Sequence, residues 1–129
     1  FMNVKATAKF VRISPQKTRL VVSLIRSLPV EVARQQLAFS KKEAAGVVLK
    51  VLDSALANAR HNFGQDVTNF FVNQAFSDEG PKLHRHRARA RGTAAPIRKR
   101  MSHITIAVGP IEDAPKTPVK KVKSAKKLA

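Results

Sequence analysis

The feature that most restricts this chain is the stretch "HRHRARARG", which runs from His84 to Gly92. Arginine occupies every second position from Arg85 to Arg91. Alternation with a period of two is typical of a strand with one buried face. Here the intervening positions hold His or Ala, so neither face is apolar enough to pack on a hydrophobic core. We therefore expect a strand that leaves the core and lies against something polar.

Positive charge is concentrated around this stretch. The 129 residues include 25 Lys and Arg against 8 Asp and Glu, a formal net charge of +17. Residues 80–109 hold eight of these bases and no acid, whereas residues 1–79 hold 11 bases and 6 acids. Such a surplus repels itself unless a polyanion relieves it. Nucleic acid and an anionic membrane surface are the two candidate polyanions.

The chain length predicts one domain, at residues 1–109, followed by a basic tail at residues 110–129. The tail contains three prolines and few bulky apolar residues, so we expect it to be disordered or ordered only by RNA. No apolar run is long enough for a membrane span, and "FMNVKATAKF" lacks the apolar core of a secretory signal. The chain has no cysteine, which fits a reducing compartment and excludes disulfides and thiolate chemistry.

The first half of the domain predicts one strand and three helices. Residues 3–12 alternate, and the face expected to be buried holds Val4, Ala6, Ala8 and Phe10. Ser14 as N-cap, with Pro15 at the first helical position, begins a helix that Pro29 is expected to stop. The expected apolar face of this helix consists of Leu20, Val21, Leu24, Ile25 and Leu28.

Two further helices are expected before the second strand. A short helix spans about residues 30–38, and the longest helix spans about residues 41–62. A capping box formed by Ser40 and Glu43 is expected to begin the long helix, and Gly64 is expected to close it in a left-handed conformation. Its apolar stripe consists of Ala44, Val47, Val48, Val51, Leu52, Ala55, Leu56 and Ala59.

The second half of the domain predicts two strands, at residues 67–77 and 102–108, separated by the basic segment. If they pair, residues of about 78–102 form the far end of one hairpin, with a turn at Gly92 and Thr93. Each arm reaches roughly 30 Å at about 3.3 Å per residue. The expected fold class is α+β, with a three-stranded antiparallel sheet packed against three helices and a long protruding β-hairpin.

An isolated two-stranded ribbon is marginally stable in water, and cations on both of its faces repel one another. Such a ribbon needs an anionic environment, and arginine suits it because its planar fork makes bidentate contacts with phosphate. A solvated loop of charges is the alternative. The acid-free composition, the preference for Arg over Lys and the strong flanking strands argue against it.

"FVNQAFSDEGPKLHRHRARARGTAAPIRKRMSHITIAV" closely resembles the signature of the large-subunit ribosomal protein twenty-two family. The family pattern has an acidic-Gly-Pro step, an Arg-rich stretch, a Gly, further basic residues and then Ser-His-Ile-Thr. The segments "RISPQKTRLVVSLIR" and "LDSALANARHN" also resemble the family, so the likeness covers about residues 3–109. At the tip, His86, Arg87, Ala88 and Thr93 depart from the residues common in the family.

The resemblance implies a structural constituent of the large ribosomal subunit, cytoplasmic and not an enzyme. It would bind large-subunit rRNA and neighbouring ribosomal proteins, aid subunit assembly and not form a homo-oligomer. Its hairpin would line the exit tunnel and meet the nascent polypeptide. The implied rRNA contacts are Lys5, Lys9, Arg12, Ser14, Gln16, Lys17, Arg19, Lys82, Arg85, Arg87, Arg98, Lys99, Arg100, Ser102 and His103. The implied tunnel-facing tip is His84, Arg85, His86, Arg87, Arg89, Arg91 and Gly92.

Other classes of function fit the residues less well. A DNA-binding protein with flexible β-arms would need a dimer and a different order of elements. A membrane-surface protein would need apolar side chains to insert, and the basic segment has almost none. The acids are scattered, so no catalytic constellation emerges. His84 and His86 share a strand face, but flanking arginines disfavour a metal, so we expect neither a metal nor another cofactor.

Overall fold

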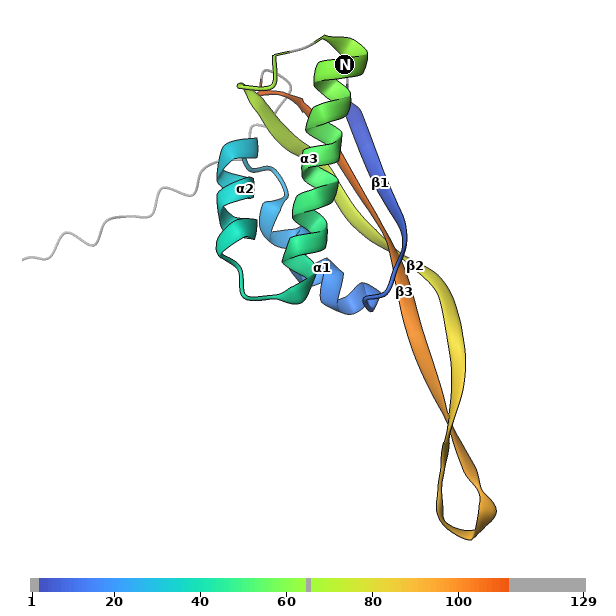
Figure 1. The fold of residues 1–129 in the computed structure, drawn as a ribbon. Helices are drawn as coiled ribbons and strands as arrows, with labels where there is room; N and C mark the ends of the chain where they lie inside the picture. Colours follow the sequence, from blue (N-terminus) through green and yellow to red (C-terminus); the bar gives the residue numbers. More distant parts are fainter. Residues whose placement is uncertain (1–2, 65, 112–129) are drawn as a thin grey trace, which may run out of the picture.

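The computed structural model describes residues 3–64 and 66–111 of the chain. The elements follow the expected order β-α-α-α-β-β (Figure 1). They are β1 (Val4–Val11), α1 (Pro15–Ile25), α2 (Val30–Phe39), α3 (Glu43–Phe63), β2 (Phe70–Ala88), a 3-10 turn (Ala90–Gly92) and β3 (Ala94–Pro110). Pro110 still belongs to β3, and the rest of the expected tail, from residue 112 onward, lies outside the described residues.

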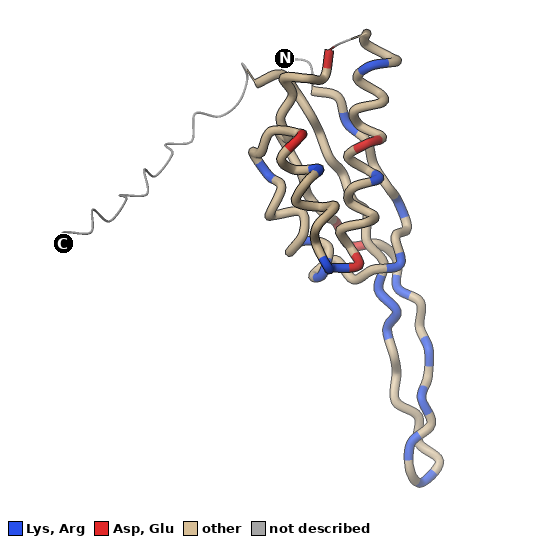
Figure 2. The backbone as a smooth tube through the Cα atoms, turned by 60° about the vertical axis from the view of Figure 1, so that its left-hand side comes forward, with Lys and Arg blue, Asp and Glu red and all other residues tan. Residues whose placement is uncertain are grey.

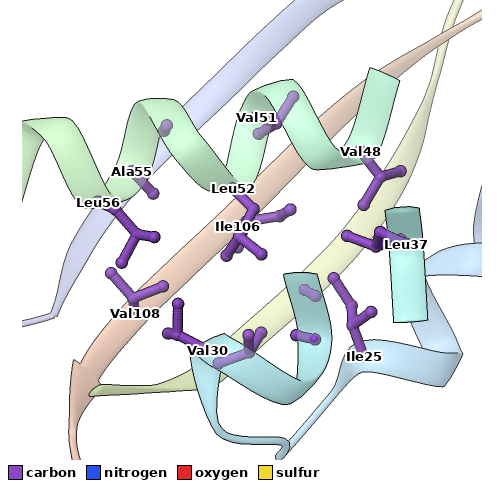
Figure 3. Close-up of a cluster of buried hydrophobic side chains, with 14 of the residues drawn as sticks. Ile25, Val30, Leu37, Val48, Val51, Leu52, Ala55, Leu56, Ile106 and Val108 are labelled. Carbon is purple, nitrogen blue, oxygen red and sulfur yellow. The ribbon is translucent and has the colours of Figure 1, made fainter. Parts of the chain in front are cut away.

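The three strands form one antiparallel sheet in the order β1-β3-β2, so β3 is central. All three helices pack on the same face of this sheet (Figure 1). The core lies between α3 and β3, where Leu52 and Leu56 pack near Ile106 and Val108 (Figure 3). The predicted α+β class and the predicted stripe of α3 are confirmed, since every stripe residue is buried except the half-buried Val47.

Strands β2 and β3 pair along nearly their whole length, from Phe70 opposite Pro110 to Ala88 opposite Ala94. Their far halves project from the domain as a twisted two-stranded ribbon (Figure 1). We call residues 80–100 the hairpin. The predicted hairpin is therefore present. Its turn is centred on Arg91 and Gly92, one residue before the expected position, and both have left-handed φ angles of 59° and 69°.

Helix α1 differs from the prediction in its end and in its buried face. It begins as expected, with the Ser14 side chain accepting a hydrogen bond from the Lys17 backbone N–H. It ends at Ile25 rather than near Pro29, because the chain turns to pair with β2. There the Ser27 N–H donates to Val72 O at 3.0 Å, and the Val72 N–H donates to Leu28 O at 2.9 Å.

The buried face of α1 is centred on Thr18, Val21, Val22 and Ile25, whereas the predicted Leu20 and Leu24 are each 57% exposed. Polar anchors set this rotation. Thr18 Oγ1 lies 2.6 Å from Ser77 Oγ in the interior. Arg19 Nε donates to Ser77 O at 3.1 Å, and Arg26 donates to Ala75 O. These groups satisfy carbonyls on the outer edge of β2 that would otherwise be open to another strand.

The predicted capping box of α3 is wrong. The helix begins at Glu43 with Lys42 as N-cap, and no side chain caps it. Ser40 lies two residues before the N-cap, and its hydroxyl instead accepts a hydrogen bond from the Lys42 N–H at 3.3 Å. The C-terminal prediction is confirmed, because Gly64 has a φ of 59° and its N–H donates to the last turn of the helix.

Within the described residues, none of the helices has the length and apolarity that crossing a membrane requires.

Strand β1 departs from simple alternation near its end. Ala8 pairs with Ile104 and Val11 pairs with Ser102, so Lys9 and Phe10 together face the single residue His103. This β-bulge gives Phe10 a φ of 59° and moves its side chain from the expected buried face to the surface, where it is 60% exposed. The bulge also returns Val11 to the core side of the sheet.

Candidate nucleic-acid interface

The hairpin presents basic side chains on both faces. Residues that lie directly opposite each other share a face. One face carries Arg85 and Arg87 with Lys99, around a thin apolar strip formed by Leu83, Ile97 and Ala95, all half-buried. The other face consists of Lys82, His84, His86, Ala88, Ala94, Pro96, Arg98 and Arg100. The cationic character expected from the sequence therefore holds for both sides of the ribbon.

The hairpin contains two like charges directly across from each other, on Lys82 and Arg100. His84 lies opposite Arg98. Residues 80–100 contain no carboxylate to offset them. Across residues 78–101, all of which the structure describes, no residue is buried. The ribbon thus has almost no core of its own, and its bases have no carboxylate within the hairpin to offset them.

The tip is a tight turn with two exposed arginines. The Arg89 N–H donates to Thr93 O at 2.8 Å, and the Thr93 hydroxyl donates to Ala90 O at 2.8 Å. These bonds close the turn around Arg91 and Gly92, whose left-handed φ angles direct the chain back. Arg89 and Arg91 lie at this turn and are exposed. Figure 2 shows basic residues and no acid at this end of the hairpin.

A polar hollow lies where the hairpin leaves the domain. It has a volume of ≈ 340 Å³ and is lined by Ser14, Pro15, Gln16, Arg19, Glu79 and Arg100. The structure thereby brings together four of the predicted contact residues, Ser14, Gln16, Arg19 and Arg100, from two separate stretches of the sequence. The Arg19 guanidinium is already engaged with Ser77 O through Nε, so only its outer nitrogens are available to a ligand.

The other predicted contacts on the domain are spread over its surface. Lys5 and Lys9 are exposed on β1, and Arg12 is exposed just after it. Lys17 is also exposed, but it lines a different hollow with Leu20 and Lys42 on the helical side. The structure does not bring Lys17 together with the residues at the base of the hairpin.

Two residues of the Ser-His-Ile-Thr segment have structural roles. Ser102 is fully buried, so its hydroxyl is not exposed for the contact with rRNA that the resemblance implies, and that contact stays a prediction. His103 Nδ1 accepts a hydrogen bond from the Phe10 N–H at 3.0 Å and so holds the bulge. Its ring makes a perpendicular contact with the Phe10 ring, at 5.1 Å between centroids. His103 remains half-exposed.

Sequence reasoning missed the sheet face that no helix covers. This open face carries Thr7, Thr105 and Phe76 in one row, with Thr7 Oγ1 3.3 Å from Thr105 Oγ1. Phe10 lies on the same side through its contact with His103. From its hydrophobicity, Phe10 was expected on the buried face of residues 3–12. Phe76 was expected only as part of the strand at residues 67–77. Only the flanking Lys9 and Arg12 indicated a surface role for this stretch.

The acids are concentrated on the helical side and at the base of the hairpin (Figure 2). Asp53 pairs with Arg34 at 3.0 Å across α2 and α3. Asp66, in the loop before β2, accepts hydrogen bonds from the Thr68 hydroxyl and backbone N–H, and these lower its pKa. The described residues hold no cluster of three His, Cys, Asp or Glu side chains that could bind a metal. The geometry thus separates a mixed-charge helical layer from a basic ribbon.

The chain is similar to known proteins over most of its length. A family model described as ribosomal protein L22p/L17e matches residues 6–109. A protein of Magnetococcus marinus named large ribosomal subunit protein uL22 is 53% identical over 109 residues, which cover 84% of this chain and 96% of that protein. A protein of Syntrophus aciditrophicus with the same name is 55% identical over 105 residues, 81% of this chain and 96% of its own length.

Proposed function

Because this chain belongs to the ribosomal protein L22p/L17e family, whose members are structural components of the large ribosomal subunit and not enzymes, we propose that it binds large-subunit rRNA mainly through its hairpin. The observation that carries this proposal is the ribbon with basic side chains on both faces and no acid within it. In bacteria such a component resides in the cytoplasm as part of the ribosome.

The RNA surrounds the hairpin rather than touching one side of it. Lys82, Arg98 and Arg100 extend from one face, and Arg85, Arg87 and Lys99 extend from the other. Packed phosphates on both sides neutralise these side chains and remove the repulsion between opposed pairs. Arginine predominates because its fork makes two parallel hydrogen bonds to one phosphate.

The hollow at the base of the hairpin and the basic end of β1 dock the domain itself on rRNA. Ser14, Gln16, Arg19 and Arg100 line one concave polar site, which suits a phosphate backbone better than an apolar ligand. Lys5, Lys9 and Arg12 add positive charge along β1. The mixed-charge helical layer faces solvent or neighbouring ribosomal proteins, and the chain acts as a single copy in each subunit.

The tip of the hairpin lines the tunnel for the nascent polypeptide. The paired arms beyond Glu79 contain about ten residues each and reach roughly 30 Å from the domain. A turn closed by internal hydrogen bonds places Arg89 and Arg91 at a defined distance from the domain. This arrangement holds the two arginines at the wall of a channel while the domain remains at a distance from it.

The test is sedimentation of variants with large subunits. Arg98→Ala combined with Arg100→Ala should lower the fraction of the chain that remains with large subunits after a high-salt wash, because phosphate contacts and the counterion release that accompanies them are lost. The matched control removes the same charge from the helical layer with Lys41→Ala and Lys50→Ala, and it should sediment like the unmodified chain.

Thermal unfolding of both double variants should match that of the unmodified chain, since none of the four side chains is buried. An Arg98→Ala, Arg100→Ala chain whose domain melts early would make these residues structural and overturn the proposal. Co-migration of the unmodified chain with chromosomal DNA, rather than with large subunits, would support the DNA-arm alternative instead.

A further inference from the structure

Phe10 has a conformation that costs free energy on two counts. Its φ of 59° lies in the left-handed region, which is strained for a bulky aromatic residue. Its side chain is 60% exposed, although plain alternation along β1 would bury it. The bulge that causes both features adds one residue to the strand without adding a core contact from Phe10. Features of this kind are concentrated at functional sites.

The exposed ring is held in one place. The Phe10 N–H donates to His103 Nδ1 at 3.0 Å, which fixes the backbone of the bulge. The Phe10 and His103 rings meet at an interplanar angle of 88°, with centroids 5.1 Å apart. Strand β3, to which His103 belongs, is the central strand of the sheet and is therefore a rigid support. The ring is accordingly presented to solvent in a preorganised position.

The surroundings of this ring favour an anionic partner. Lys9 precedes Phe10 and Arg12 follows two residues later, both exposed. No acid occurs in the sequence before Glu31. Asp78 is the nearest carboxylate along the sheet, opposite His103 on β2. An apolar protein partner would have to desolvate two cations to cover the ring, whereas a nucleotide supplies a flat base together with charged phosphates.

We propose that Phe10 is a stacking platform for one unpaired nucleobase of the large-subunit rRNA, with Lys9 and Arg12 holding the phosphates on either side of it. The inference rests on the proposed function and adds to it a contact with a base. Bases that leave a helical stack are commonly held on exposed aromatic rings, and the contact tolerates any base because every base has a flat face.

The chain offers a direct reporter because it contains no tryptophan. Phe10→Trp introduces a single fluorophore at the platform. Its emission should be quenched when large-subunit rRNA is added to the full chain, since a base stacks on the indole. The matched control is Phe39→Trp, because Phe39 is 86% exposed but lies on α2 in the helical layer. Its emission should not be quenched.

A second variant measures the contribution of the flat ring to binding. Phe10→Leu keeps an exposed apolar side chain and removes the stacking surface. It should weaken binding to large-subunit rRNA about five- to hundredfold, the range expected for one stacked base. Phe10→Tyr should retain the affinity of the unmodified chain, and Phe39→Leu should leave it unchanged.

The outcomes separate this inference from the function on which it rests. If the unmodified chain fails to bind large-subunit rRNA at all, the proposed function is overturned. If it binds, but Phe10→Leu binds equally well and the Phe10→Trp reporter is not quenched, only the stacking platform is overturned. The platform is also overturned if the reporter responds to purified large-subunit proteins and not to rRNA, which would assign it to a protein partner.

Discussion

Two interior hydroxyl groups near the base of the hairpin differ in their surroundings. Ser77 Oγ lies 2.6 Å from Thr18 Oγ1, whereas Ser102 Oγ has no hydrogen-bond partner among the described residues. Removing a buried hydroxyl without a partner removes only a desolvation penalty. Ser102→Ala should therefore leave the free energy of unfolding unchanged or raise it by about 1 kcal/mol. Ser77→Ala should lower it by about 1 kcal/mol, as denaturant titration will show.

The same pair of variants tests whether Ser102 contacts RNA. A buried hydroxyl has no access to a phosphate on the surface, so Ser102→Ala should bind large-subunit rRNA as tightly as the unmodified chain. A loss of affinity with unchanged stability would restore the contact that sequence resemblance implies and would show that the strand opens on binding.

For single residues, the sequence predicts well which positions are buried, except where a polar contact rotates a helix or a β-bulge shifts a strand. The stripe of α3 is confirmed, and Ile104, Ile106 and Val108 of the expected strand at residues 102–108 are fully buried. Leu20 and Phe10 were wrongly placed in the core. Their exposure depends on the Thr18–Ser77 and Phe10–His103 contacts, which join residues far apart in the chain. A periodic pattern carries no information on such distant partners.

Gly80 is the point at which the two long strands change from domain to hairpin. A Cβ at this position would lie 3.1 Å from Met101 Cβ and 3.2 Å from the Met101 backbone. The pairing register also shifts between Glu79 and Lys82. Gly80→Ala should therefore push β3 outward and lower the free energy of unfolding by roughly 1–3 kcal/mol, the cost typical of overpacking.

Gly46 provides the contrasting control for this prediction. It lies in α3 with nothing within 4 Å of an added Cβ, so Gly46→Ala should raise stability by up to about 1 kcal/mol through helix propensity alone. Equal effects of the two substitutions in urea titrations would mean that the close approach at Met101 relaxes without cost.

The hairpin should be dispensable for folding of the domain. Residues 83–99 contribute no buried side chain, and Lys82 lies directly opposite Arg100. Replacing residues 83–99 with Asn-Gly joins these two positions by a two-residue turn of the kind that suits a hairpin. The shortened chain should melt at or above the temperature of the full chain in low salt, because self-repulsion falls. Its rRNA binding should weaken sharply.

A large drop in melting temperature would show instead that the ribbon stabilises the sheet from which it extends. The sequence predicts the existence of this element, since an acid-free alternating segment lies between two strong strands. The pairing register of its two strands is known only from the structure. The register shifts near Gln74 and Glu79 leave no periodic signal in the sequence, and the hairpin is polar on both faces.

The described part of the molecule divides its charge between two regions. The helical layer contains Glu31, Glu43 and Asp53 among its bases, and Asp66 lies in the loop before β2, whereas the hairpin contains bases and no acid (Figure 2). The densest positive charge of the described residues therefore lies on the hairpin, at one end of the molecule, whereas the helical layer at the other end is mixed in charge. The net charge alone does not predict this uneven distribution of charge. The distribution arises because α2 and α3 pack on one face of the sheet, whereas the hairpin projects beyond the domain.

If the tip lines the path of the nascent polypeptide, a reactive group at Arg91 should reach that polypeptide. The chain has no cysteine, so Arg91→Cys creates a single attachment point for a photo-crosslinker at the exposed turn. Ser54→Cys, on the exposed surface of α3, is the matched control. In ribosomes stalled with a labelled nascent chain, the Arg91→Cys derivative should give a crosslink to that chain and the Ser54→Cys derivative should give none. Crosslinks from the tip to rRNA alone would place the hairpin wholly inside RNA, with its scaffolding role intact and its tunnel role refuted.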